Sequence, residues 1–258
     1  MRVPFWKLSG AGNDFVLLAG LPQGRSGAAL ARRLCDRRRG VGADGLLVMS
    51  RRAGRIRLNY WNAAGSAAFC GNGSRCSALW AAEQGWSDKR RFVIDTNRGP
   101  LTARLTTKSR AEVSMPAPKG LRLGRKLTAL KRSLTVHTVD AGVPHAVVLV
   151  SDIEKTDVRG LGRALRFHKV FGRSGANVDF VEMRGDVLFL RTYERGVEDE
   201  TLACGTGVVA AAFVARALGR DCSRVKVRCG AILTVAFDRS GVSLEGPGET
   251  VFTGEAVI

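Results

Sequence analysis

The sequence has few of the features that mark membrane, secreted or metal-binding proteins. No apolar run approaches the ~20 residues of a membrane span, and polar residues interrupt the first 20 positions where a signal peptide would need an apolar core. Only three histidines are present, and no two of the six cysteines have C-x-x-C spacing. At 258 residues the chain is also too long to need a disulfide framework. We therefore expect a cytoplasmic protein with no metal, disulfide or membrane partner.

Acidic residues are also scarce. There are 23 of them against 41 lysines and arginines, which gives a formal net charge of +18. Such a balance can indicate nucleic-acid binding. However, the basic residues are scattered along the chain, and only two tyrosines are present to stack on bases. We predict a solvated basic surface and no nucleic-acid partner. The alternative, a basic nucleic-acid-binding protein, predicts steeply salt-dependent DNA binding.

What the sequence does contain is one short motif that occurs twice. Residues 70–73 read CGNG and residues 204–207 read CGTG. Each copy opens an apolar segment with little polar face, which is typical of a helix buried on most sides. Each copy therefore predicts a cysteine at a helix N-terminus, where free backbone N–H groups can bind an anion.

The two motifs belong to a longer internal repeat. Matching residues keep the same order in both halves, at separations of 131 to 134 positions: Asn13 with His145, Ala43 with Ala176, Cys70 with Cys204, Gly99 with Gly230, and Pro116 with Pro247. Five matches in register are not expected by chance. We interpret the chain as two homologous lobes, residues 1–117 and 133–258, joined by a basic linker at residues 118–132.

Local patterns within the two lobes also correspond. Strand-like segments precede the motifs, short strands follow the central helices, and an amphipathic helix is expected early in each lobe. These elements are predicted at residues 55–61, 92–95, 101–106 and 111–115 with a helix at 28–38, and at residues 187–193, 225–228, 232–237 and 242–244 with a helix at 158–167. The predicted fold class is α+β. Each lobe would be a curled mixed β-sheet around its central buried helix, and the two helix N-termini would point into one cleft between the lobes.

Two such cysteines suggest a particular chemistry. A thiol at a helix N-terminus is easier to ionise, because the helix dipole favours the thiolate. One thiolate could remove the α-proton of an amino acid while the other thiol protonates the opposite face. The helix-end N–H groups would hold the carboxylate and stabilise the developing charge. We predict cofactor-free racemisation or epimerisation; buried structural cysteines and a thiol redox switch are the alternatives.

At the residues around these cysteines the chain resembles the diaminopimelate epimerase family, over essentially its whole length. The resemblance lies in five motifs: residues 9–15 (SGAGNDF), 65–76 (GSAAFCGNGSRC), 142–145 (GVPH), 175–178 (GANV) and 194–207 (ERGVEDETLACGTG). It implies interconversion of LL- and meso-2,6-diaminopimelate, a precursor of lysine and peptidoglycan, without pyridoxal phosphate. A homodimer is implied by the resemblance alone.

The resemblance also implies roles for individual residues. Cys70 and Cys204 match the acid/base pair of the family, and His145 and Glu194 match residues that support the thiols. The positions that match substrate-binding residues are Asn13, Asn62, Gly71, Asn72, Asn177, Glu194, Arg195, Gly205 and Thr206. The alternative function on the same scaffold is a related racemase without pyridoxal phosphate for another amino acid, such as histidine.

Overall fold

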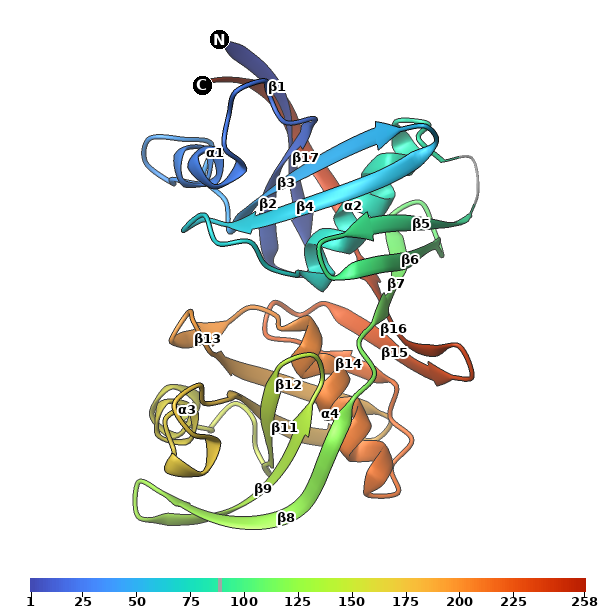
Figure 1. Ribbon diagram of the computed structural model, residues 1–258. Coiled ribbons are helices and arrows are strands. Elements are labelled where there is room, and N and C mark those ends of the chain that lie inside the picture. Colours follow the sequence, from blue (N-terminus) through green and yellow to red (C-terminus); the bar gives the residue numbers. More distant parts are fainter. Residues whose placement is uncertain (88–89) are drawn as a thin grey trace. The chain divides into compact units, whose positions relative to one another are not determined.

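The computed structural model describes residues 1–87 and 90–258, which form two compact units (Figure 1). Unit 1 comprises Met1–Ser114 and Glu245–Ile258, and unit 2 comprises Met115–Leu244. The elements of unit 1 are β1 (Arg2–Gly10), β2 (Asn13–Ala19), α1 (Gly27–Leu34), β3 (Gly45–Arg52), β4 (Arg55–Asn62), α2 (Gly71–Glu83), β5 (Arg91–Thr96), β6 (Gly99–Leu105), β7 (Arg110–Met115) and β17 (Glu249–Val257). The elements of unit 2 are β8 (Lys119–Ala129), β9 (Arg132–Asp140), β10 (Pro144–Leu149), α3 (Val158–Arg166), a 3₁₀ turn (Lys169–Phe171), β11 (Asn177–Arg184), β12 (Val187–Glu194), β13 (Asp199–Thr201), α4 (Gly205–Ala217), β14 (Arg224–Lys226), β15 (Ile232–Asp238) and β16 (Gly241–Pro247).

The two units repeat one pattern of strand pairing. In unit 1, β1–β2 is antiparallel, β2–β3 parallel, β3–β4 antiparallel, β4–β5 parallel and β5–β6 antiparallel. In unit 2, β9–β10, β10–β11, β11–β12, β12–β14 and β14–β15 follow the same alternation. The predicted α+β fold with two homologous lobes is therefore confirmed.

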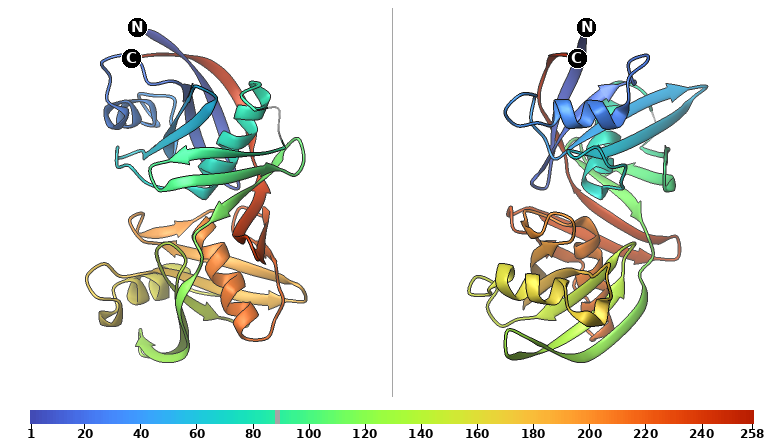
Figure 2. Two further views of the ribbon diagram at one scale, coloured as in Figure 1. Left: turned by 45° about the vertical axis from the view of Figure 1, so that its right-hand side comes forward. Right: turned by 60° about the vertical axis from the view of Figure 1, so that its left-hand side comes forward.

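A central helix lies within the curled sheet of each unit (Figure 2). Helix α2 contacts strands β1 to β4, β6 and β17, and helix α4 contacts strands β9 to β12, β14 and β15. Both helices are buried along most of their length. Their many alanine, glycine and serine residues let strands approach from several sides, which a helix with one polar face could not allow.

The outer helices α1 and α3 are amphipathic, as predicted. Each begins at a residue that accepts a hydrogen bond from the first turn: Ser26 from the Ala29 N–H, and Asp157 from the Gly160 N–H. Helix α1 packs Leu30 and other apolar side chains onto β1, β2 and β3. These helices therefore cover sheet surface that the central helices do not reach.

The unit boundaries differ from those expected from the sequence, which were 1–117 and 133–258. Residues 118–132, expected to be a linker, instead form most of a hairpin: β8 pairs with β9 through a two-residue turn at Leu130 and Lys131, both with positive φ. The C-terminal strand β17 pairs with β1, from Arg2 opposite Val257 to Ser9 opposite Glu249. The last strand of each repeat therefore pairs with the first strand of the other repeat: β8 with β9, and β17 with β1.

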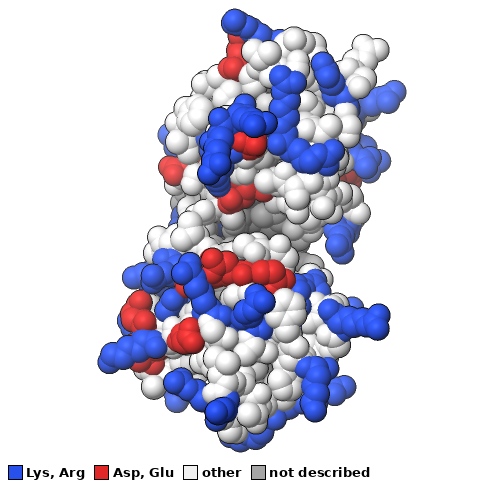
Figure 3. All heavy atoms as spheres, turned by 90° about the vertical axis from the view of Figure 1, so that its left-hand side faces the viewer, with Lys and Arg blue, Asp and Glu red and all other residues white. Residues whose placement is uncertain are grey.

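Basic side chains are spread over the surface. On the face in Figure 3, lysines and arginines lie in many separate groups, with smaller acidic groups among them. Within residues 1–87 and 90–258, no helix has both the length and the apolar character required to cross a bilayer.

Candidate active site

Both motif cysteines occupy the same structural position. Cys70 and Cys204 are the N-cap residues of α2 and α4, with φ/ψ of −139°/110° and −125°/108°. The Gly73 N–H donates to the Cys70 sulfur at 3.4 Å, and the Cys204 sulfur lies 3.4 Å from the Thr206 hydroxyl. Each cysteine therefore places a thiol at the positive end of a buried helix, as the repeated motif predicted.

In unit 1 the structure links four polar residues in a chain of hydrogen bonds next to this helix end. The Arg75 guanidinium donates to the Asn72 amide oxygen at 2.8 Å, and the Asn72 amide nitrogen donates to the Asn13 amide oxygen at 2.6 Å. Asn13 in turn donates to the Asp44 carboxylate at 2.9 Å. This chain fixes the orientation of both amides, because each has its oxygen and its nitrogen assigned by a neighbour.

Asn62 lies opposite Gly45, next to Asp44, and its side chain bonds elsewhere. It is the last residue of β4, and its amide oxygen accepts from the Ser66 N–H at 2.8 Å. The side chain therefore stabilises the turn that follows β4, which is a common role for a loop asparagine.

In unit 2 the predicted residues His145, Asn177 and Arg195 form a second hydrogen-bonded group. His145 and Asn177 are opposite each other on the parallel strands β10 and β11, and the His145 Nε2 lies 3.4 Å from the Asn177 amide nitrogen. The Asn177 amide oxygen accepts from the Arg195 backbone N–H at 2.8 Å. The Glu194 carboxylate accepts from the Thr201 hydroxyl, also at 2.8 Å. One member of this group, Asp179, was not predicted from the sequence; its carboxylate lies 2.6 Å from the His145 Nδ1.

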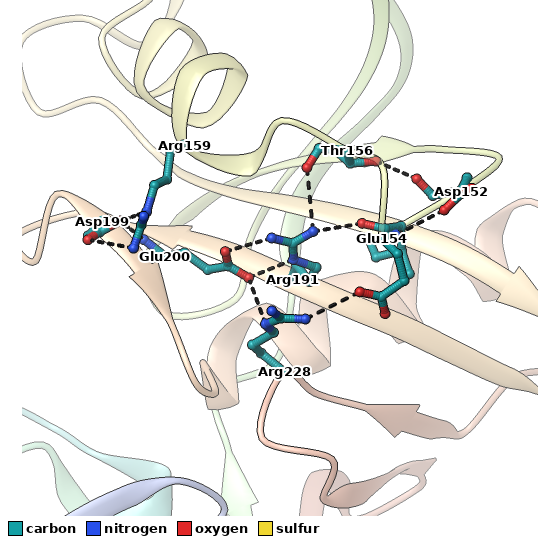
Figure 4. A network of polar contacts seen from close by, with 9 residues as sticks. Asp152, Glu154, Thr156, Arg159, Arg191, Asp199, Glu200 and Arg228 are labelled. Atoms are coloured by element: carbon teal, nitrogen blue, oxygen red, sulfur yellow. Dashed lines mark hydrogen bonds and ion pairs between the residues drawn. The ribbon is translucent and has the colours of Figure 1, made fainter.

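An ion-pair network holds the segment that leads to Cys204 (Figure 4). Arg191 on β12 forms a bidentate pair with Glu200 on β13, at 2.6 and 2.8 Å, and also donates to the Ile153 carbonyl. The Arg228 guanidinium lies 3.6 Å from the same carboxylate. Because Glu200 precedes Cys204 by four residues, the network holds the segment just before α4 against β12.

The ionisation of Cys204 differs from the expectation. Burial raises the pKa of the Cys204 thiol well above its usual value, and the negative charges of Glu194 and Asp179 raise it further. The prediction of an easily ionised thiol is therefore wrong for Cys204. Desolvation of the thiolate outweighs the favourable helix end, because the side chain is almost fully enclosed. The surroundings of Cys204 therefore favour its neutral thiol over the thiolate.

This raised pKa predicts the reactivity of Cys204 toward iodoacetamide. Only the thiolate reacts, so the labelling rate of Cys204 should rise about tenfold per pH unit from pH 7 to 9 without levelling off. Mass spectrometry of quenched samples would give the rate at each cysteine, with the exposed Cys229 as a control for labelling efficiency. A rate that reaches a plateau below pH 9 would contradict the assignment.

Comparison with known proteins extends this description. A sequence profile described as "Diaminopimelate epimerase" matches residues 5–119 and 137–256. The chain is 37% identical over 261 residues to a diaminopimelate epimerase of Chlorobaculum tepidum, covering 96% of this chain and 98% of the relative. It is 38% identical over 270 residues to a diaminopimelate epimerase of Aquifex aeolicus, covering 97% of this chain and 96% of the relative.

A solved structure agrees at the level of the fold. The PhzF-family phenazine biosynthesis protein of Bacillus anthracis superposes with a TM-score of 0.76 at 15% sequence identity and 100% coverage of both chains. This likeness concerns the fold alone, whereas the profile and the sequence relatives cover nearly the whole chain at much higher identity. The chain belongs to the diaminopimelate epimerase family.

Proposed function

We propose that the protein interconverts LL- and meso-2,6-diaminopimelate by a two-base mechanism. The observation that carries this proposal is the equivalent placement of Cys70 and Cys204 as N-caps of two repeat-related buried helices. One cysteine acts as a thiolate that removes the α-proton, and the other acts as a thiol that protonates the opposite face. The α-carbon is inverted as a result.

The helix ends supply the charge stabilisation. The first backbone N–H groups of α2 and α4, those of Gly71, Asn72, Gly205 and Thr206, would bind the carboxylate next to the reacting carbon. As the proton leaves, negative charge grows on this carboxylate, and fixed donors stabilise it without reorganising. This chemistry uses no cofactor and no metal, because the thiols and the helix ends provide acid, base and charge stabilisation.

The remaining residues would recognise the distal half of the substrate. That half carries an ammonium and a carboxylate, which suit Glu194 and Arg195 respectively, together with the amides of Asn13, Asn62 and Asn177. His145 and Glu194 would support the thiols. The alternative, a histidine racemase on this scaffold, is not favoured, because relatives that are 37% and 38% identical over nearly the whole chain are diaminopimelate epimerases.

A substrate panel tests this proposal. Purified, reduced protein would be incubated with LL-diaminopimelate, L-histidine or L-proline, and the products separated by chiral chromatography. We expect the meso isomer to form from LL-diaminopimelate and the other two amino acids to remain unchanged. Turnover of histidine or proline without turnover of diaminopimelate would refute the proposed substrate.

Arg75→Met tests the unit 1 amide chain. Arg75 is fully buried, burial lowers the pKa of its guanidinium, and its Nε and Nη1 have no hydrogen-bond partner within residues 1–87 and 90–258. Loss of its bond to Asn72 should lower kcat/KM by about tenfold, the equivalent of one charge-assisted hydrogen bond. Stability should change little or rise, because methionine has a similar volume and no charge to bury.

The matched control is Arg104→Met, which removes a half-exposed arginine paired with Glu112. Steady-state kinetics and urea denaturation of both variants would separate the two effects. An unchanged kcat/KM in Arg75→Met would show that the amide chain does not contribute to substrate binding.

We also propose that the protein acts as a homodimer, on the basis of the family resemblance, and in the cytoplasm, on the basis of the features of its sequence. Light scattering after gel filtration would test the dimer, with an expected mass of twice the 27.7 kDa of one chain.

A further inference from the structure

Asp179 is a buried carboxylate without a role in the mechanism described so far. It lies on β11, two residues after Asn177, and its side chain and that of His145 are both 0% exposed. One carboxylate oxygen accepts from the Thr192 hydroxyl at 2.8 Å, and the other lies 2.6 Å from the His145 Nδ1. A buried carboxylate is costly unless its partners are fixed, so these contacts define its position closely.

The hydrogen bonds leading to Asp179 have only one consistent direction. The Arg195 backbone N–H can only donate, so it fixes the Asn177 amide oxygen toward itself. The Asn177 amide nitrogen then faces the His145 Nε2 and donates to it. Nε2 must therefore be unprotonated, and the ring proton must lie on Nδ1, where it is donated to Asp179. The pattern thus assigns a neutral ring with the Nδ1–H tautomer.

Asp179 also lies against the helix that begins at Cys204. A Cβ atom placed on Gly207 would be 2.5 Å from an Asp179 carboxylate oxygen and 3.2 Å from the Thr192 hydroxyl. Gly207 is in the first turn of α4, so the carboxylate faces the positive end of this helix. The same residue therefore contacts both the His145 ring and the turn that carries the thiol.

We propose that Asp179 is a positioning residue for the reaction, which fixes the tautomer and orientation of His145 and, through the ring, the amide of Asn177 and the backbone at Arg195. The proposal rests on the proposed function, because the residues that it positions are those assigned to support the thiols and bind substrate. Asp179 itself does not touch the reacting atoms. Its effect is to hold donors and acceptors in one arrangement before substrate arrives.

The first test is nitrogen NMR of the wild-type protein, and it needs no turnover. The chain has three histidines, so His137→Gln and His168→Gln identify the His145 ring signals by elimination. We expect a protonated Nδ1 and an unprotonated Nε2 at pH 7 to 8. A ring protonated on Nε2, whether the other neutral tautomer or the imidazolium, would overturn the proposal.

The second test compares two substitutions. Asp179→Ala removes the 2.6 Å partner of the Nδ1–H and leaves the longer, 3.4 Å contact with Asn177 to hold the ring. The ring should then populate both tautomers, and kcat should fall on the order of ten- to hundredfold, the range found when a carboxylate that orients a metal-binding histidine is removed. Asp179→Asn should keep the Nδ1–H tautomer and restore most of kcat. Its amide oxygen can accept from the ring while its amide nitrogen donates to the Thr192 hydroxyl.

Asp186→Asn is the matched control, since this exposed carboxylate pairs with the Arg224 side chain at the surface and its replacement should leave both readouts unchanged. Wild-type kcat or a wild-type tautomer in Asp179→Ala would overturn the proposal. If Asp179→Ala does not fold, Asp179→Asn decides, because loss of its Nδ1–H tautomer would also overturn it. Absence of diaminopimelate turnover in the wild type would instead refute the proposed function, while the NMR result would still test the arrangement.

Discussion

Replacing either Cys70 or Cys204 with alanine is expected to lower the kcat of epimerisation by about 10²–10⁴-fold, the usual contribution of a positioned acid or base. Each variant lacks one of the two proton carriers, so neither direction of the reaction can be completed. The loss should be similar for the LL and meso substrates, because a thiol that donates in one direction must accept in the other. Steady-state kinetics in both directions would measure it.

The controls for this result come from the same chain. Cys76 is buried in α2, and Cys222 is buried in unit 2, yet neither is an N-cap. Cys76→Ala and Cys222→Ala should therefore retain kcat within about twofold while having a similar cost in stability. A Cys204→Ala or Cys70→Ala variant as active as these controls would show that the thiol is structural.

Gly207→Ala is expected to destabilise unit 2 by about 2–4 kcal/mol. An alanine in a helix interior would ordinarily gain about 1 kcal/mol over glycine. Here the added Cβ would be 2.5 Å from the Asp179 carboxylate, so either the carboxylate or α4 must move. Overpacking costs about 1–3 kcal/mol, and weakening the charge-assisted hydrogen bonds to Thr192 and His145 adds a comparable amount.

The repeat provides the comparison for this variant. At the equivalent position in unit 1, a Cβ on Gly73 would lie 3.0 Å from the terminal Cδ2 of Leu47, so this side chain needs to shift by only a few tenths of an ångström. Gly73→Ala should therefore change the free energy of unfolding by less than about 1 kcal/mol. Urea denaturation followed by circular dichroism would compare the two variants. Equal destabilisation would contradict the proposed contact between Asp179 and α4.

Much of the secondary structure around the cysteines could be predicted from the sequence. The apolar segments after Cys70 and Cys204 have little polar face, and a helix of that kind has to be enclosed by other elements, as α2 and α4 are. The N-cap position of each cysteine followed from the glycines at the start of these segments. Local pattern was sufficient here, because the packing of a central helix demands apolar character throughout.

Strands β8 and β17 could not be assigned correctly from local pattern. β8 is mostly exposed and rich in lysine and arginine, so its composition resembles that of a solvated connection. The pairing of β17 with β1 joins residues about 250 positions apart and leaves no periodic signal at either strand. Pairing between strands so far apart in the sequence depends on the two completed sheets. The pattern of one short segment holds no information about it.

The ionisation of the site also required the structure. Asp179 and Glu182 both lie in the strand-like stretch NVDFVEM, and this pattern does not show that Asp179 is the one that is buried. Asp179 is completely buried, it bonds to Thr192 and His145, and its charge raises the pKa of Cys204. These three partners come from three separate segments of the chain. The helix dipole was the only influence on the thiol that sequence reasoning could identify, and burial proved stronger.

The most direct test of the two-thiol mechanism is deuterium incorporation during turnover in deuterated water. Purified, reduced protein would be mixed with LL-diaminopimelate, and both isomers would be examined by NMR at low conversion. We predict one deuterium at the inverted α-carbon of the meso product and none in the recovered LL substrate, because the thiol that removes the proton returns only that proton. Deuterium appearing equally fast in the recovered LL substrate would indicate a single base and contradict the account.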